Sequence, residues 1–192
     1  MDNGIRDAEA HDTFRWSPTY TLRHRSRRAV WTLVWILLAA WTPPPLHRWR
    51  TLLLRIFGAR LHATVKVYGS ARVWDPTNLR MDAYSTLGPK VTCYCVDRIQ
   101  IGHHVVISQG AHLCCGTHDI RAPSFRLLTK PITIGPNAWI CAEAFVGPGV
   151  CVGEGAVLAA RAAAFADLSP WGVYRGNPAT LIKERPRFQR GP

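Results

Sequence analysis

Hydrophobic side chains recur at every sixth position from residue 67 onward. The most regular run places one aliphatic side chain at each of Ile134, Ile140, Val146, Val152 and Leu158. A period of six fits neither the 3.6-residue repeat of a helix nor the two-residue alternation of a strand. It indicates a chain that turns a corner every six residues and points one aliphatic side chain inward from each flat face. Three such faces close a triangular coil, and stacked coils bury a continuous narrow core.

Small or β-branched residues stand at two fixed places after each of these aliphatic positions. Those that follow directly are Gly135, Cys141, Gly147, Gly153 and Ala159. Those in the fourth place are Ala138, Ala144, Val150, Ala156 and Ala162. The backbone can turn at such positions because no large substituent on Cβ is in the way. The period continues upstream at Ile101, Ile107 and Leu113, and less regularly at Val67, Val73, Leu79 and Val91. The chain is therefore predicted to be mainly β.

The period stops at Thr117-His118-Asp119 and resumes after a polar stretch. A stack of coils can eject a loop without losing its core, because the next coil simply continues the stack. Residues 119–131 are predicted to be such a loop.

The N-terminal part of the chain has a different pattern. Residues 1–28 are polar and end in a basic run, and residues 29–41 are almost wholly apolar. A helix over that apolar stretch spans roughly 20 Å, which is short of the ~30 Å hydrocarbon core of a membrane. Pro43–Pro45 ends the helix, because proline lacks the amide that a continuing helix needs. Residues 46–57 then repeat at helical spacing among arginines.

Two interpretations of these helices stay open, and they do not exclude each other. Tryptophans and arginines at the level of lipid headgroups favour an interfacial membrane anchor. Alternatively, the helices cap one end of the main domain. The predicted organisation is a helical segment over residues 1–62, a repeat domain over 63–185 and a tail over 186–192.

Charge and cysteine content narrow the choice of partners and compartment. The net charge of +12 favours anionic partners. Nucleic acid is disfavoured, because stacked coils offer neither a helix for a groove nor a platform for stacking bases. The six cysteines form no CxxC pair and no zinc-ligand spacing, so free thiols in a reducing cytoplasmic compartment are expected.

Three stretches carry a family resemblance: ISQGAHLCCGTHD at 107–119, the hexads of 131–162, and GNPATLIK at 176–183. With them the chain resembles the hexapeptide-repeat acyltransferases, and among these the colanic-acid-type exopolysaccharide O-acetyltransferases, relatives of the galactoside and nodulation acetyltransferases. The resemblance implies a left-handed parallel β-helix, a homotrimer, and acetyl-CoA as the donor substrate.

The resemblance also makes His118, at the root of the loop, the catalytic histidine. A neutral imidazole can take the proton of a sugar hydroxyl while that oxygen attacks the thioester. Cys115 offers an alternative nucleophile, although a small residue buried in the coil is the favoured reading. For His118 the alternative is a histidine satisfied by backbone hydrogen bonds.

Further site residues follow from the same resemblance. Asp97 matches an acceptor-binding aspartate of the galactoside relatives with an offset of one residue, and Glu143 matches a residue that orients the base or the acceptor. The alternative for Asp97 is a solvated corner residue, and for Glu143 an ordinary outward-facing charge. Cys95 replaces an asparagine that is typical of the subgroup, which changes the usual acceptor contact.

Positions that match the donor site are Trp139, Ala142, Ala160 and Lys183. Simple packing is an alternative role for Trp139. Phe165, Ala166 and Thr180 replace residues that contact the coenzyme's phosphates in the family. Arg161, Arg175 or Arg185 could supply the missing charge.

A metal site is not expected. Three histidines bind zinc in β-helices of the gamma carbonic anhydrase type, but the spacing of His103, His104 and His112 does not match that pattern well.

The predicted function is acetyl transfer from acetyl-CoA to a sugar hydroxyl in surface-glycan assembly, at the inner membrane face. The alternatives are an acyltransferase acting on an amino sugar or a small alcohol, and a non-catalytic β-helix scaffold.

Overall fold

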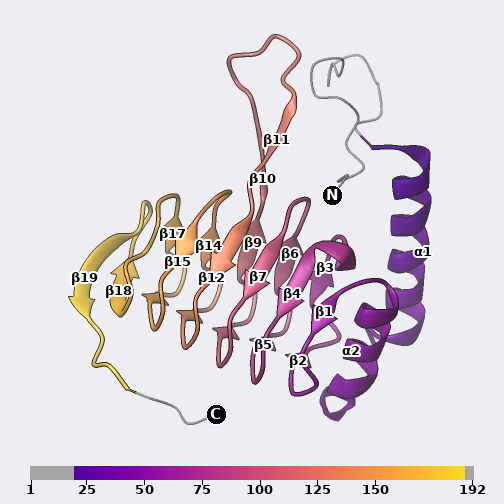
Figure 1. Ribbon diagram of the computed structural model, residues 1–192, viewed down its shortest axis with the longest axis horizontal. Coiled ribbons are helices and arrows are strands. Elements are labelled where there is room, and N and C mark those ends of the chain that lie inside the picture. The colour runs from indigo at the N-terminus through magenta and orange to yellow at the C-terminus, as the bar shows by residue number, and fades with distance from the viewer. Residues whose placement is uncertain (1–19, 189–192) are drawn as a thin grey trace.

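Short strands that end at corners wind into a parallel β-helix, with two helices at its N-terminal end (Figure 1). The structure, a computed structural model, describes residues 20–188. Each complete coil contributes one strand to each of three sheets, which we call faces 1, 2 and 3 in the order in which the chain crosses them.

The strands of the three faces are as follows. Face 1 contains β1 (Arg60–Leu61), β4 (Leu79–Met81), β7 (Ile99–Ile101), β12 (Ile132–Ile134) and β15 (Cys151–Val152). Face 2 contains β2 (Lys66–Val67), β5 (Thr86–Leu87), β8 (Val106–Ile107), β13 (Trp139–Ile140), β16 (Val157–Leu158), β18 (Gly172–Arg175) and β19 (Thr180–Glu184). Face 3 contains β3 (Arg72–Val73), β6 (Thr92–Tyr94), β9 (His112–Cys114), β14 (Phe145–Val146) and β17 (Ala163–Ala164). A short 3-10 turn, η3 (Pro76–Asn78), precedes β4.

The hexad side chains form the core. In face 2, Ile140 lies opposite Ile107 in one neighbouring coil and Leu158 in the other, and all three are fully buried. In face 1, Ile134 lies between Ile101 and Val152 in the same way. Neighbouring strands within the three faces are parallel, except that β19 pairs antiparallel with β18. The mainly β solenoid predicted from the sixth-residue period is confirmed.

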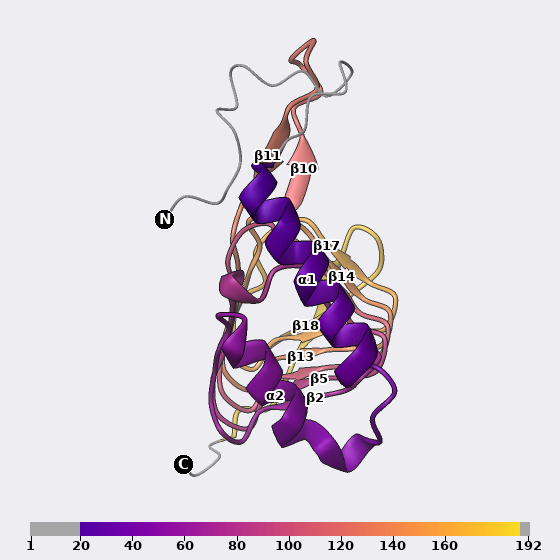
Figure 2. The same cartoon turned by 90° about the vertical axis from the view of Figure 1, so that its right-hand side faces the viewer.

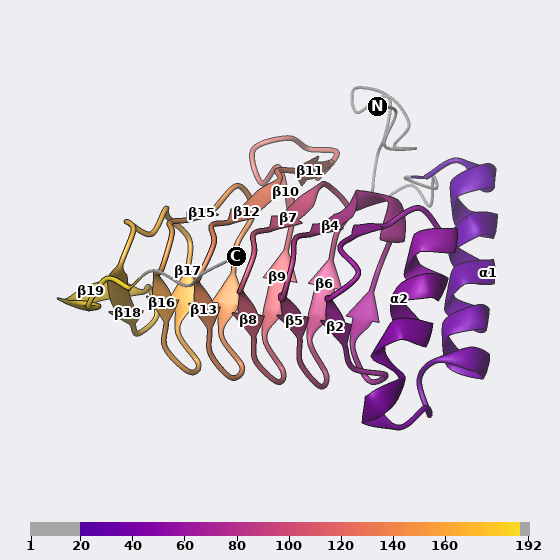
Figure 3. The ribbon, with the colours of Figure 1, turned by 60° about the horizontal axis from the view of Figure 1, so that its bottom comes forward.

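The N-terminal segment forms helix α1 (Leu22–Leu38), a 3-10 turn η2 (Pro44–Leu46) and helix α2 (His47–Ile56). Figure 2 shows α1 crossing the end of the β-helix, and Figure 3 shows the two helices side by side there. Helix α1 extends into the basic run, because the Thr21 side chain caps it by accepting from the His24 amide. The first coil begins at Arg60, so the predicted boundary at residue 62 lies inside it.

Buried tryptophans hold α1 on the first coil. The indole of Trp31 donates to the carbonyl of Val73 at 2.8 Å, and that of Trp35 donates to the carbonyl of Gly69 at 3.1 Å. Each hydrogen bond satisfies a polar atom that packing would otherwise leave buried and unpaired. The helices therefore cap the β-helix.

Asp75 adds an ionic contact to this cap. Its carboxylate lies 2.9 Å from Nε2 of His24 and 2.6 Å from the guanidinium of Arg27. Burial acts to raise the pKa of Asp75, but hydrogen bonds from Thr77 and the charge of Arg27 outweigh it and hold this pKa below its ordinary value. Asp75 is therefore a carboxylate at neutral pH, and it joins α1 to the corner between the first and second coils.

Arg50 fixes the turn between the two helices. Its side chain is fully buried, and it donates to the carbonyls of Val67, Thr42, Pro43 and Pro44. The guanidinium thus binds the turn 42–44 to the first coil. Across residues 20–188, neither helix is long and apolar enough to span a membrane.

Candidate active site

Between β9 and β12 the chain leaves the coil as a hairpin (Figure 1). Strands β10 (Gly116–His118) and β11 (Leu127–Thr129) pair antiparallel, with His118 opposite Leu127. The sequence predicted a loop over 119–131; the structure has a β-ribbon that starts at Gly116 and returns to the coil at Ile132. The ribbon keeps the hydrogen bonds of β10 inside the hairpin, so the root of the excursion is an ordered strand.

Asp119 closes the tip of the hairpin. Its carboxylate accepts from the Arg121 amide at 3.0 Å and from the Arg126 guanidinium at 3.2 Å. The first of these hydrogen bonds is the main reason why the pKa of Asp119 lies below its ordinary value. Asp119 therefore has a structural role beside His118.

His118 is half-buried and held in one orientation. Its Nδ1 lies 2.8 Å from the carbonyl oxygen of Phe125, and its ring stacks on the ring of Phe125 with centroids 4.4 Å apart. A carbonyl oxygen only accepts, so Nδ1 carries the proton and Nε2 keeps its lone pair in the neutral ring. This is the tautomer that a general base requires. Phe125 was not predicted from the sequence, because its only signal is an aromatic side chain within a polar stretch.

Asp97 lies at the corner from which the hairpin leaves. It follows β6 in the coil before the hairpin, and its carboxylate accepts from the Arg98 amide at 2.6 Å. The carbonyl of Arg98 in turn accepts from the amide of Ile132, where the chain re-enters the coil. Asp97 and His118 therefore belong to the same corner, between faces 3 and 1.

Glu143 lies at a different corner. It precedes β14, between faces 2 and 3, and its carboxylate pairs with Arg161 at 2.6 Å. Both side chains of this pair are largely exposed. The two predicted acceptor residues, Asp97 and Glu143, are thus separated by the width of face 3 within one chain.

The predicted donor residues lie together, away from His118. Trp139 stands on face 2, 44% exposed, and donates to the hydroxyl of Ser108 at 2.9 Å. Ala142 and Ala160 occupy the next corner in successive coils, where the carbonyl of Ala142 accepts from the Arg161 amide. Lys183, on β19, pairs with β18 at the end of face 2. Within one chain, the predicted donor residues therefore lie along face 2 and its next corner, whereas His118 lies at another corner.

Three arginines and Lys183 were predicted to contact the phosphates of coenzyme A, and they differ in whether their side chains already have a partner. Arg161 is engaged by Glu143, and Arg185 donates to the carbonyls of Asn137 and Gly155. Arg175 is exposed at the end of β18, as is Lys183 on β19. These two are better placed to meet a phosphate. Phe165, 61% exposed, packs its ring near that of Phe145 instead.

The geometry gives little support to a nucleophilic cysteine or to a metal site made of histidines. Cys115 is fully buried, and burial raises the pKa of its thiol, which disfavours the thiolate that attack would need. His103 and His104 contact each other, whereas His112 lies on face 3 against Phe145. Over residues 20–188, no group of three His, Cys, Asp or Glu side chains could hold a metal ion.

The chain is similar to known acetyltransferases in sequence and in fold. No family model matches the chain. WcaF of Escherichia coli (strain K12), named as a colanic acid biosynthesis acetyltransferase, is 40% identical over 156 residues, which cover 81% of this chain and 86% of that protein.

Two solved structures have the same fold. A maltose O-acetyltransferase from Clostridium difficile 630 gives a TM-score of 0.77 at 22% identity, over 87% of this chain and 90% of that one. A hexapeptide-repeat acetyltransferase from Vibrio cholerae O1 biovar eltor, complexed with acetyl coenzyme A, gives a TM-score of 0.74 at 21% identity, over 86% of this chain and 88% of that one.

Proposed function

The chain belongs to the colanic-acid-type acetyltransferases of the hexapeptide-repeat class, and on this basis we propose that it transfers acetyl from acetyl-CoA to a sugar hydroxyl, with His118 as the general base. The observation that carries the proposal is the hydrogen bond between Nδ1 of His118 and the carbonyl of Phe125, since in the neutral ring it leaves the lone pair on Nε2. An exopolysaccharide or another surface glycan supplies the hydroxyl.

The reaction needs one proton to move and one bond to be exchanged. Nε2 of His118 takes the proton of the acceptor hydroxyl while the oxygen attacks the thioester carbonyl. The tetrahedral oxyanion then collapses and expels the thiolate of coenzyme A, which takes the proton from the imidazolium. The acceptor leaves as an acetate ester, and no covalent acyl-enzyme is required.

We also propose that the active site forms between subunits of a homotrimer. The support is the separation of His118 from Trp139, Ala142 and Ala160, because the donor surface of one chain cannot serve the histidine of the same chain across face 3. A neighbouring copy would bring its own donor surface to the hairpin. Asp97, at the same corner as His118, and Glu143 from the neighbour would then hold the acceptor.

The direct test is acetyl transfer by the purified protein. Incubation with acetyl-CoA and a panel of glycans, lipid-linked glycans, amino sugars and small alcohols should release coenzyme A only with a glycan. Mass spectrometry should find an acetate ester on that glycan. Transfer to an amine would favour the amino-sugar alternative. Failure with every acceptor, together with no acetyl-CoA binding, would favour a scaffold.

A further proposal concerns the inner membrane face, where we expect the enzyme to work. Residues 20–62 hold eight arginines and no acidic residue. Large apolar side chains of α1, of α2 and of the turn between them are exposed, among them Leu33 at 56%, Trp41 at 73% and Ile56 at 67%. Apolar area combined with cations suits a helix that rests on anionic lipids.

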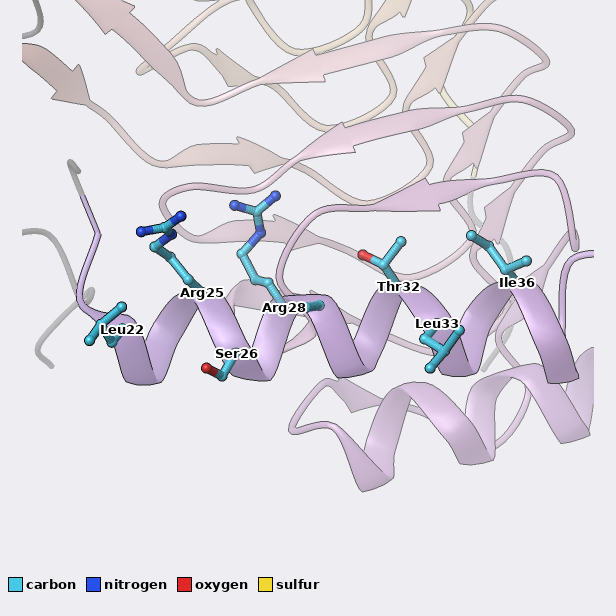
Figure 4. A pocket seen from close by; sticks show the side chains of 8 residues that line it. Leu22, Arg25, Ser26, Arg28, Thr32, Leu33 and Ile36 are labelled. Carbon is cyan, nitrogen blue, oxygen red and sulfur yellow. The ribbon is translucent and has the colours of Figure 1, made fainter. Parts of the chain in front are cut away.

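A shallow depression of about 730 Å³ along α1 combines both properties. Figure 4 shows Arg25 and Arg28 on one edge of the helix, followed along it by Thr32 and Ile36. The exposed guanidinium of Arg25 could meet lipid phosphates while the aliphatic side chains meet acyl chains.

Cosedimentation with vesicles tests the membrane proposal. Wild type should bind vesicles that contain phosphatidylglycerol more tightly than vesicles of phosphatidylcholine alone, and salt should weaken this binding. Leu33→Glu should weaken it by about tenfold or more, because an apolar contact becomes a repelled charge. The matched control is Ile182→Glu, an exposed aliphatic position at the other end of the molecule, which should bind like wild type. Equal binding of both variants would contradict the proposal.

A further inference from the structure

A groove of about 900 Å³ lies between α1 and the first two strands of face 3, β3 and β6. We call it the α1 groove. Its size is within the range of small-molecule sites. It shares Arg28, Thr32 and Ile36 with the depression on the outer side of α1, so the two hollows meet along one edge of the helix. None of the donor residues described above contributes to it.

The α1 groove is positively charged. Arg28, Arg72 and Lys90 line it, and its lining includes no acidic residue. Arg28 lies over the ring of Trp74 at 3.4 Å, and the salt bridges described for residues 20–188 do not include it. Burial lowers the pKa of Arg28, so this cation has lost part of its hydration. An anion entering the groove would replace that hydration.

Aromatic rings form the other part of the lining. Trp74 and Tyr94 are partly exposed and lie edge to face, with centroids 5.5 Å apart. Trp31 and Trp35 line the helix side. Flat rings with a polar atom at one end suit the ring of a sugar, whose C–H face packs on them while its hydroxyls stay hydrated. Cations beside aromatic rings therefore favour an acidic sugar over a fatty acid or a free phosphate.

The groove ends at the catalytic hairpin. The ring of Tyr94 occupies the space that a side chain on Gly116 would need: a Cβ there would lie 2.9 Å from Cε1 of Tyr94. Gly116 begins β10, and His118 is the last residue of that strand. The carbonyl of Tyr94 also accepts from the amide of Cys115, just before the hairpin. A chain that lies in the groove thus approaches the hairpin that carries His118.

We propose that the α1 groove binds an acidic sugar segment of the glycan acceptor and directs the acceptor hydroxyl toward His118. This inference rests on the proposed function, which it deepens by naming the acceptor as an anionic glycan. It also gives the positive charge a role in substrate recognition as well as in membrane contact.

Steady-state kinetics with two matched acceptors tests the proposal. One is an oligosaccharide that contains a uronic acid, and the other is the same oligosaccharide with its carboxyl group reduced to an alcohol. The variant is Arg72→Glu with Lys90→Glu, both at exposed positions. It should raise KM for the acidic acceptor by about tenfold or more, because two attractions become repulsions. KM for the neutral acceptor and for acetyl-CoA should stay unchanged.

A control and a binding assay complete the test. Lys66→Glu reverses an exposed charge on face 2 of the first coil and should change neither acceptor's KM. Tryptophan fluorescence reports acidic oligosaccharide binding without turnover, since three tryptophans line the groove. If no acceptor is turned over but acidic sugar binds and the double variant abolishes binding, the transferase proposal fails and the groove stands. If wild type turns over both acceptors and the double variant changes KM for the acidic and the neutral acceptor by the same factor, the groove proposal is overturned.

Discussion

Replacing His118 with alanine is expected to lower kcat for acetyl transfer by about 10²- to 10⁴-fold, the usual contribution of a general base. The reason is that a sugar hydroxyl that keeps its proton is a poor nucleophile, and the proposed base is Nε2 of His118, since Nδ1 is bound to the Phe125 carbonyl. The affinity for acetyl-CoA should change little, because the predicted donor residues lie along face 2 and its corner with face 3. The readouts are release of coenzyme A, yield of the acetate ester, and acetyl-CoA binding by calorimetry.

His62→Ala is the matched control for this variant. His62 is exposed on the first coil, where it contacts Thr64, and its replacement should leave kcat unchanged. Near-wild-type turnover in His118→Ala would remove this histidine from the mechanism.

Assemblies that contain two different inactive variants test whether the active site is formed between subunits. A His118→Ala subunit and an Ala160→Trp subunit should each be inactive alone, the second because a bulky side chain blocks the donor surface. Coexpression should restore part of the activity if the histidine of one chain serves the donor surface of another. No recovery in assemblies shown to contain both subunits would place the whole site in one chain.

Replacing Arg50 with methionine is expected to lower the free energy of unfolding by about 3 kcal/mol, since main-chain acceptors that lose a buried donor cost about 1–3 kcal/mol each. The carbonyls of Thr42, Pro43, Pro44 and Val67 all accept from this one guanidinium. Some of them would regain water, because the turn 42–44 lies near the surface. Methionine keeps most of the packing volume, so the loss reports the hydrogen bonds. Urea unfolding followed by circular dichroism measures it.

Arg48→Met, on the same helix, is the control for Arg50→Met. Arg48 is exposed, and a surface substitution of this kind changes stability by about 0.5 kcal/mol or less. Equal midpoints for the two variants would show that the turn does not depend on the buried guanidinium.

The core of the β-helix could be predicted from the sequence because it depends on local spacing. One aliphatic residue in six is enough to line a triangular coil, and Ile107, Ile140 and Leu158 meet in neighbouring coils at that spacing. The left-handed sense came from the family resemblance, since a period carries no information about handedness. The start of α1 was less predictable: Arg27 and His24 look like an exposed basic run until Asp75, about 50 positions away, is seen to bind them.

The sequence by itself determined the coil period, the point where it is interrupted, and His118 as the histidine at that interruption. Only the tertiary structure decided that the interruption is a β-hairpin, that Phe125 fixes the tautomer of His118, and that Asp97 and Glu143 lie at different corners. The physical reason is that periodicity is a property of neighbours along the chain, whereas hydrogen bonds and corners depend on which segments meet in space. The α1 groove is of the second kind, because α1, β3 and β6 line it together.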